Sequence, residues 1–227
     1  MFDRVYTKFN EEITFHVDDN IFNVHSANYA YQFNTKKIGR GEVYFIDCNN
    51  NKLVLKEYNR GGLIRYITKN KYLYLGLKRT RPFKEFLMLK RMHELELPVP
   101  RPVSIKLSIS GFYYTGKIIT EEVLNAVNLK KIIISKKINN QMISNIISVL
   151  RNLIQNNIFH SDLNINNILI DESLSIYIID FDNSFFTKRK KLLIKPLDRL
   201  IKSIRKEQEN KKLIKSISEL KDEIILS

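Results

Sequence analysis

Tryptophan is absent from this 227-residue chain, and cysteine, proline and glycine are scarce at 1, 5 and 7 residues. The lone Cys48 excludes a disulfide framework and a cysteine-rich metal site, and it favours a reducing compartment. No window approaches the roughly 18 uncharged apolar residues of a membrane span, and residues 1–4 begin no secretory signal pattern. Any contact with a membrane is therefore expected to be peripheral.

Acidic residues are also in the minority, with 24 Asp and Glu against 38 Lys and Arg, and the formal net charge is +14. Such an excess favours phosphates, anionic lipid surfaces or nucleic acid as partners, without choosing among them. With 44% hydrophobic residues, the chain has the composition of a soluble globular enzyme made of one domain or two closely joined lobes.

The periodicity of apolar residues changes along the chain from a β-rich first part to a helical second part, after a mixed pattern over residues 1–30. The expected elements are an antiparallel sheet over 31–56, a partly ordered basic insertion at 59–81, a helix at 82–95, strands at 103–108 and 112–120, and helices at 124–138 and 141–157. We therefore expect a small N-terminal lobe over 1–123 and a larger, helical C-terminal lobe over 124–227.

The most specific motif reads H-S-D-L-N-I-N-N from His160 to Asn167, and an apolar strand ending in Asp180 follows it. Kinase-like folds use such a set to hold a nucleophilic hydroxyl and magnesium around ATP. Asp162 is the candidate catalytic base, because a carboxylate on a rigid loop can orient a hydroxyl and accept its proton. Asn167 and Asp180 are candidate Mg²⁺ ligands. His160 is expected to brace the loop by hydrogen bonds.

A competing interpretation makes Asp162 and Asn167 ordinary turn residues of an asparagine-rich loop. The apolar strand that ends in Asp180-Phe181-Asp182 argues against it, because a simple turn does not require that second acidic segment.

Upstream, the predicted strand 53–58 carries Lys56 between apolar neighbours on one face. In a kinase fold such a lysine binds the α- and β-phosphates of ATP and is held by a helix glutamate, for which Glu85 is the candidate. The alternative is a solvent-facing lysine on an edge strand. Gly39 and Gly41 precede this strand and permit a tight turn whose backbone amides approach phosphate oxygens.

With these residues in this order, the chain resembles the 3-deoxy-D-manno-octulosonic acid (Kdo) kinases of Gram-negative bacteria, which are relatives of the lipopolysaccharide heptose kinases. The resemblance covers about residues 32 to 206. It implies an α+β, protein-kinase-like fold of two lobes, with a small antiparallel N-lobe that carries one helix and a mainly helical C-lobe. The blocks that carry it are 39–41, 54–64, 80–86, 97–102, 160–164, 179–182 and 197–206.

The resemblance implies ATP-dependent phosphorylation of the 4-hydroxyl of Kdo on a Kdo-lipid A precursor. It carries Asp162 over as the base, Lys56 as the phosphate-binding lysine, and Asn167 and Asp180 as metal ligands, with ATP and Mg²⁺ as cofactors. It places the protein peripherally on the cytoplasmic side of the bacterial inner membrane, with the glycolipid and the anionic membrane surface as partners. No nucleic acid and no obligate protein partner are expected.

Some features depart from that family, and others bear on the acceptor. The missing tryptophans and the lysine-rich tail after Lys206 are unusual for such enzymes. The basic run 188–191 and the helix over 197–206, which has one apolar and one basic face, fit acidic headgroups. The same helix also fits an ordinary packing helix with a solvated basic face.

A small-molecule kinase is favoured over a protein kinase, because Asn164 stands where Ser/Thr protein kinases usually carry lysine and only residues 181–227 follow Asp180. A heptose kinase, or an aminoglycoside-type or RIO-like kinase, remains a second enzyme interpretation. A basic nucleic-acid-binding protein or a pseudokinase is the non-catalytic alternative. The aromatic residues form no recognisable nucleic-acid motif, and the intact motif residues favour activity.

Overall fold

A computed structural model describes most of the chain, namely residues 3–24, 31–38, 41–48, 50–58, 71–207 and 210–226. The chain forms two compact units, each with buried hydrophobic residues of its own. The first unit comprises residues 1–90 and 101–122, and the second comprises 91–100 and 123–227.

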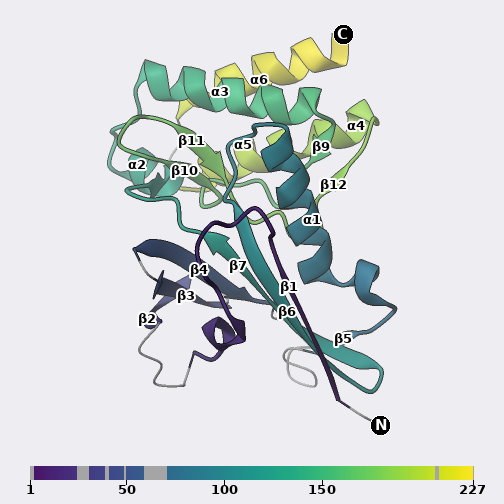
Figure 1. Ribbon diagram of the computed structural model, residues 1–227. Helices are drawn as coiled ribbons and strands as arrows, with labels where there is room; N and C mark the ends of the chain where they lie inside the picture. Colours follow the sequence, from purple (N-terminus) through teal and green to yellow (C-terminus); the bar gives the residue numbers. More distant parts are fainter. Residues whose placement is uncertain are drawn as a thin grey trace. The chain divides into compact units, whose positions relative to one another are not determined.

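The first unit is built on an antiparallel sheet, which has seven strands among the described residues. Six strands follow the order β1-β6-β7-β4-β3-β2, and the short β5 also pairs with β7 (Figure 1). The strands are β1 (Arg4–Phe9), β2 (Gln32–Ile38), β3 (Gly41–Cys48), β4 (Asn51–Glu57), β5 (Tyr72–Leu73), β6 (Pro102–Ser110) and β7 (Tyr113–Glu121). The predicted sheet over 31–56 and the predicted strand pair that follows the helix are confirmed.

Strand β4 lies inside the sheet, with β3 on one side and β7 on the other. Its Lys56 is paired in register with Val43 of β3 and with Ile118 of β7. The interpretation of Lys56 as a lysine on an edge strand is therefore wrong. Alternation buries Leu53 and Leu55 completely on the opposite face of β4. The core cluster there comprises Ile21, Phe22, Tyr31, Tyr44, Ile46, Cys48, Leu53, Leu55, Val103 and Ile119.

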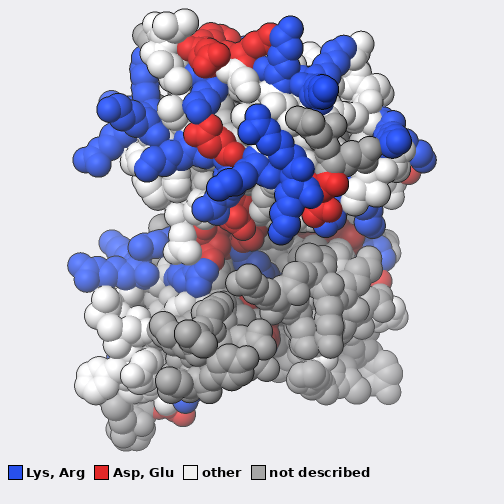
Figure 2. Space-filling model, turned by 180° about the vertical axis from the view of Figure 1, so that it is seen from behind, with Lys and Arg blue, Asp and Glu red and all other residues white. Residues whose placement is uncertain are grey.

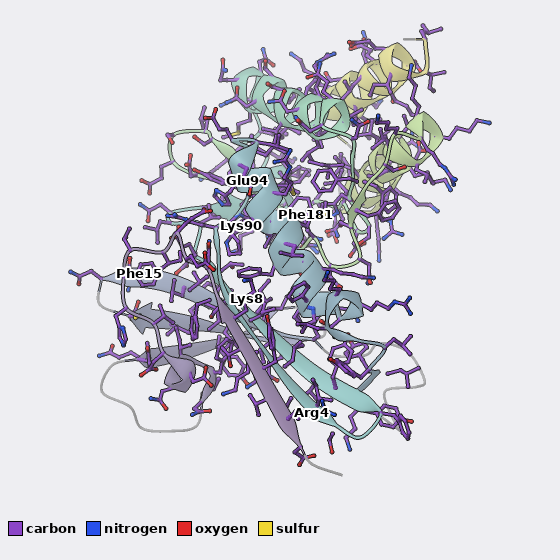
Figure 3. The ribbon with its side chains drawn as sticks, turned by 45° about the vertical axis from the view of Figure 1, so that its right-hand side comes forward. Arg4, Lys8, Phe15, Lys90, Glu94 and Phe181 are labelled. Atoms are coloured by element: carbon purple, nitrogen blue, oxygen red, sulfur yellow. The ribbon has the colours of Figure 1, made fainter. Side chains whose placement is uncertain are left out.

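The mixed pattern of residues 1–30 predicts no particular element, but the structure places the edge strand β1 there. It pairs with β6 from Arg4 opposite Ile109 to Phe9 opposite Ser104, and Figure 3 marks Arg4 and Lys8 along it. The side chains of β1 are exposed or half-buried, so the strand lacks a clear apolar alternation. A 3₁₀ turn, η1 (Asp19–Phe22), then inserts its last two residues into the core.

Helix α1 (Arg81–Glu94) confirms the helix predicted over 82–95, and it follows the 3₁₀ turn η3 (Leu77–Arg79). Pro82, in the first turn, lies directly on Gly116 of β7. A Cβ atom at Gly116 would come within 2.4 Å of Pro82 Cγ, so only glycine permits this approach of helix to strand. The close packing positions Glu85, one turn further along, beside the sheet.

The second unit is mainly helical. Its short strands form, among the described residues, a three-stranded sheet in the order β11-β10-β8 and a pair of β12 with β9. Its elements are β8 (Val127–Asn128), α2 (Leu129–Ile134), α3 (Asn140–Gln155), β9 (Ile158–Phe159), β10 (Ile168–Ile170), β11 (Ile176–Ile178), β12 (Phe185–Phe186), α4 (Lys190–Leu193), α5 (Lys195–Glu207) and α6 (Lys211–Leu226). With the antiparallel first unit, this gives the expected α+β organisation.

Asparagines set the helix boundaries in this unit. Asn139 caps α3 by accepting a hydrogen bond from the Met142 N–H at 2.9 Å, and the helix predicted over 141–157 is confirmed. The helix predicted over 124–138 is wrong at both ends, because α2 is only six residues long. Asn125 has a left-handed φ of 52°, and Asn128 caps α2 instead.

Helices α5 and α6 bury their apolar faces inside the second unit, where α6 packs against both α3 and α5. Leu197, Leu200 and Ile204 of α5 are at most 1% exposed, and Ile201 is 8% exposed. The interpretation of α5 as a packing helix with a solvated basic face is therefore confirmed, and its apolar face is not free to enter a membrane. In the part of the chain that the structure describes, no helix is long and apolar enough to cross a bilayer.

The buried position of Cys48 in β3 predicts that its thiol reacts slowly with disulfide reagents. Burial, together with the negative charge of Asp18, raises the pKa of the Cys48 thiol above its ordinary value. Because the thiolate is the reactive form, a raised pKa lowers its fraction at pH 8. We expect native protein to react with a disulfide reagent such as DTNB at least about tenfold more slowly than protein unfolded in guanidinium. Equal rates in the two states would contradict the burial of this residue.

Candidate active site

The loop after β9 is held in shape by its own side chains. Asn164 and Asn167 both donate from their amide nitrogens to the backbone oxygen of Asp162, at 2.9 and 2.8 Å. Leu163 and Ile165 are at most 2% exposed and anchor the loop in the core. The asparagine-rich sequence therefore builds a rigid loop around Asp162, and the side chain of Asp162 itself remains exposed.

His160 ties this loop to the end of β11. The imidazole is 2% exposed, its Nε2 donates to the Ile179 backbone oxygen at 3.1 Å, and its Nδ1 accepts from the Asp162 N–H at 3.1 Å. The ring also stacks edge-on against Phe181, with centroids 4.6 Å apart. With both nitrogens engaged in backbone contacts, His160 is the predicted brace of the loop.

Asn167 and Asp180 are brought together by the same connection. The Ile179 N–H donates to the Asn167 backbone oxygen at 3.0 Å, directly before Asp180. Asp180 has a left-handed φ of 65°, a conformation that aspartate adopts more readily than most residues. The turn sends Phe181 into the core at 1% exposure and leaves the Asp180 carboxylate exposed.

Asn167 and Asp180 carry oxygens of the kind that could hold a divalent cation. Among the described residues, no group of three or more His, Cys, Asp and Glu side chains could hold a metal ion. The Asn167 amide nitrogen donates to the Asp162 backbone oxygen, so Asn167 Oδ1 is the atom of this side chain that could bind a cation. Mg²⁺ is typically held by only one or two protein oxygens, with phosphate oxygens and water as its other ligands.

Arg199 of α5 is the partner of Asp162 that sequence reasoning missed. Its Nη1 donates to Asp162 Oδ1 at 2.6 Å, and both side chains are more than half exposed, at 54% and 55%. No other described residue bonds to this carboxylate, so Oδ2 has no hydrogen-bond partner within the described structure. Residues 197–206 are one of the blocks that carry the family resemblance, but nothing in their local sequence pattern connects Arg199 with Asp162.

In the first unit, the predicted pairing of Lys56 with Glu85 is confirmed. Lys56 Nζ lies 2.7 and 2.8 Å from the two Glu85 carboxylate oxygens. Glu85 is 4% exposed and Lys56 26%, so the ammonium is held by a buried anion and still reaches solvent. Tyr58, the residue directly after β4, donates its hydroxyl to Glu85 Oε2. Strand alternation predicts that Tyr58 shares a face with Lys56, but not the hydrogen bond.

Two other predicted regions are described only in part. Gly41 begins β3 and pairs with Ile38 across the hairpin, whereas Gly39 lies outside the described residues. A phosphate-binding role for Gly39 and Gly41 therefore stays a prediction. Residues 59–70 of the basic insertion also lie outside the described part, and its remainder forms β5, η3 and the first residue of α1.

Comparison with known proteins identifies a family to which the chain is similar. A sequence model of that family, described as the lipopolysaccharide kinase (Kdo/WaaP) family, matches residues 32–219. Three relatives are named 3-deoxy-D-manno-octulosonic acid kinase: one from Vibrio vulnificus (33% identity, 75% of this chain and 72% of the relative), one from Vibrio parahaemolyticus (30%, 88% and 84%) and one from Vibrio cholerae (32%, 65% and 63%). The match thus spans less than two thirds of the V. cholerae relative. A solved structure, the Cydia pomonella granulovirus kinase PK-1, aligns with a TM-score of 0.47 at 16% identity, over 70% of this chain and 53% of that one.

The burial of Glu85 predicts that loss of Lys56 is costly. In Lys56→Met the carboxylate stays buried without its cation, so we expect a loss of about 2 kcal/mol in the free energy of unfolding. We also expect ATP affinity to fall at least about tenfold. Lys52→Met on the same strand is the matched control, because Lys52 is 50% exposed and pairs with the partly exposed Asp47. Chemical unfolding and ATP titration measure both effects, and equal behaviour of the two variants would contradict the prediction.

Proposed function

The chain belongs to the lipopolysaccharide kinase (Kdo/WaaP) family, and we propose that it transfers a phosphoryl group from ATP to the 4-hydroxyl of Kdo on a Kdo-lipid A precursor. The observation that carries the proposal is the match of this family over residues 32–219, which includes Lys56, Asp162, Asn167 and Asp180. Kdo as the acceptor is supported by relatives that carry the name of Kdo kinase at 30 to 33% identity.

Asp162 is the proposed base. Its Oδ1 is occupied by Arg199, so Oδ2 accepts a hydrogen bond from the acceptor hydroxyl and then its proton. The proton is needed only as the new bond to phosphorus forms, so the main task of the carboxylate is orientation. His160 supports that orientation, because it fixes the backbone at Asp162 through the hydrogen bond from the Asp162 N–H to Nδ1.

Each unit offers groups of its own for the nucleotide. Bound ATP and its divalent metal, for which we propose Mg²⁺, supply the phosphoryl group and the charge neutralisation that its transfer requires. Asn167 Oδ1 and the Asp180 carboxylate are the proposed metal ligands. In this proposal Lys56, oriented by Glu85, binds the α- and β-phosphates. The proposed contribution of Gly39 and Gly41 is backbone amides for the phosphates.

Mass spectrometry of the acceptor tests the reaction. With ATP and Mg²⁺, we expect a Kdo-bearing lipid A precursor to gain one phosphoryl group, and a precursor without Kdo to gain none. Asp162→Asn is expected to lower turnover by about a thousandfold and to leave thermal unfolding unchanged, because the side chain is exposed. Glu172→Gln, at an exposed position in the turn between β10 and β11, is the control and should keep full activity.

Two results would each remove one part of this proposal. Full activity of Asp162→Asn would remove the base from its role. Phosphorylation of the precursor that lacks Kdo would remove Kdo as the acceptor, and would leave the kinase assignment in place.

We also propose that the protein binds peripherally to the cytoplasmic side of the inner membrane through charge alone. The apolar face of α5 is buried, whereas Lys and Arg side chains gather on one face of the second unit (Figure 2). The exposed run 188–191 adds four cations just before and within α4. Attraction of this kind depends on anionic lipid and weakens as salt shortens the Debye length.

Liposome flotation tests this membrane contact. We expect the protein to float with vesicles that contain anionic lipid at low salt, and to be released at about 1 M salt, where the Debye length is about 3 Å. Neutral vesicles should not bind it. Flotation that ignores both lipid charge and salt would contradict a purely electrostatic contact.

A further inference from the structure

Helix α5 carries a row of three cationic side chains that begins at the proposed catalytic carboxylate. Arg199, Lys202 and Arg205 follow one another at three-residue spacing, so they lie on neighbouring turns and span about 9 Å along the helix axis. The first of them pairs with Asp162 at 2.6 Å. The row therefore leads directly away from the group that would contact the acceptor hydroxyl.

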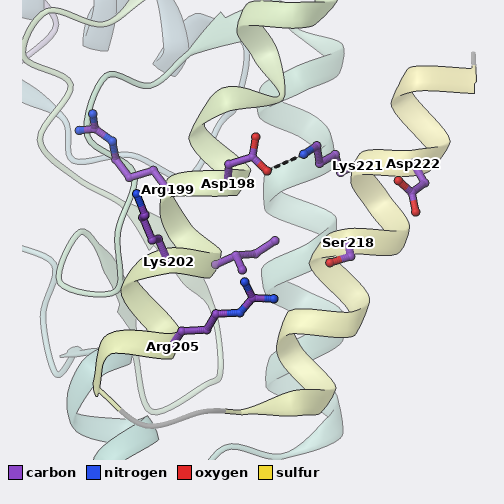
Figure 4. A pocket seen from close by; sticks show the side chains of 8 residues that line it. Asp198, Arg199, Lys202, Arg205, Ser218, Lys221 and Asp222 are labelled. Atoms are coloured by element: carbon purple, nitrogen blue, oxygen red, sulfur yellow. Dashed lines mark hydrogen bonds and ion pairs between the residues drawn. The ribbon is translucent and has the colours of Figure 1, made fainter.

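The same three residues line a groove of about 580 Å³ between α5 and α6 (Figure 4). Figure 4 shows Arg205 directed from α5 toward α6, and Lys221 of α6 directed toward Asp198 of α5. Ile201 forms an apolar part of its wall. The groove is thus a hollow with charged walls within one unit, and one of its lining residues, Arg199, pairs with Asp162 of the loop after β9. The remaining lining residues are Ser218 and Asp222.

Not all of the cations in the groove are neutralised. Lys221 pairs with Asp198 at 2.5 Å, and Arg199 pairs with Asp162. Lys202 and Arg205 are exposed and have no hydrogen-bond or ion-pair partner among the described residues.

The groove therefore keeps a positive charge. Asp222 is the one lining carboxylate left to offset Lys202 and Arg205, so the lining stays net positive. Two unpaired cations three residues apart on a helix repel each other, and an anion bound between them removes that repulsion.

We propose that Lys202 and Arg205 bind an oxyanion of the acceptor, either a sugar carboxylate or a phosphate, while the acceptor hydroxyl contacts Asp162. This rests on the proposed function, because it takes an anionic glycolipid as the acceptor. An octulosonic acid carries a carboxylate on the sugar that is phosphorylated, and a guanidinium matches carboxylate and phosphate equally well. Arg199 is then a positioning residue, which holds Asp162 at the head of the row.

Steady-state kinetics with the Kdo-bearing lipid A precursor test the groove. In the double variant Lys202→Gln/Arg205→Gln, we expect the KM for the precursor to rise about tenfold and the KM for ATP to stay unchanged, since the groove holds only the acceptor. Lys206→Gln is the matched control. It removes one charge from an exposed neighbour on α5 that does not line the groove, and it should leave both KM values unchanged.

Modified acceptors identify which oxyanion is bound. One modified acceptor has its sugar carboxylate esterified, and the other lacks its phosphates. The wild-type KM for the acceptor should rise only for the modification that removes the group bound in the groove. The double variant should be indifferent to that same modification, because its groove no longer holds the group. The two modifications thus separate carboxylate from phosphate.

Three results would count against the proposal. A wild-type KM in the double variant, or equal sensitivity of both proteins to each modified acceptor, would overturn the groove assignment and leave the kinase activity standing. If the wild type phosphorylates no Kdo-bearing precursor, the proposed function fails first, and the groove assignment falls with it.

Discussion

The hydrogen bonds that join the loop after β9 to the end of β11 are the constraint on which the second unit's chemistry depends. His160 spans the two segments through the Ile179 oxygen and the Asp162 N–H, and the Asn167 oxygen accepts from the Ile179 N–H. These hydrogen bonds fix the backbone that carries Asp162, Asn167 and Asp180. A buried imidazole serves this purpose well, because its two nitrogens lie on opposite sides of a rigid ring.

Two ion pairs hold the proposed functional groups, and their environments differ. Lys56 is bound to a glutamate that is 4% exposed, so the pair is costly to break and keeps the ammonium in place. Arg199 and Asp162 are both more than half exposed, so their attraction is screened and adds little stability. The first pair therefore fixes the ammonium that is proposed to bind phosphate, whereas the second pair is held weakly and is free to rearrange.

The excess of Lys and Arg over Asp and Glu is not distributed evenly over the protein surface. The apolar residues of α5 are buried inside the second unit, where the helix packs against α2, α4 and α6, and its cations lie at the surface. Of the α5 cations, Arg199 is paired with Asp162, whereas Lys202 and Arg205 have no ion-pair partner among the described residues. This unpaired charge is the basis of the proposed contact with an anionic acceptor.

The sequence by itself determined the elements whose signals are local: the hairpins over 31–56, helix α1 with Pro82 in its first turn, and the spacing of Asp162, Asn167 and Asp180. The asparagine cap at Asn128 was also present in the sequence, but the apolar residues around it predict a longer helix. Only the tertiary structure decided that β1 pairs with β6, that α6 covers α5, and that Arg199 reaches Asp162. Periodicity reports which face of an element is buried, but the identity of the distant segment that covers it depends on how the whole chain packs.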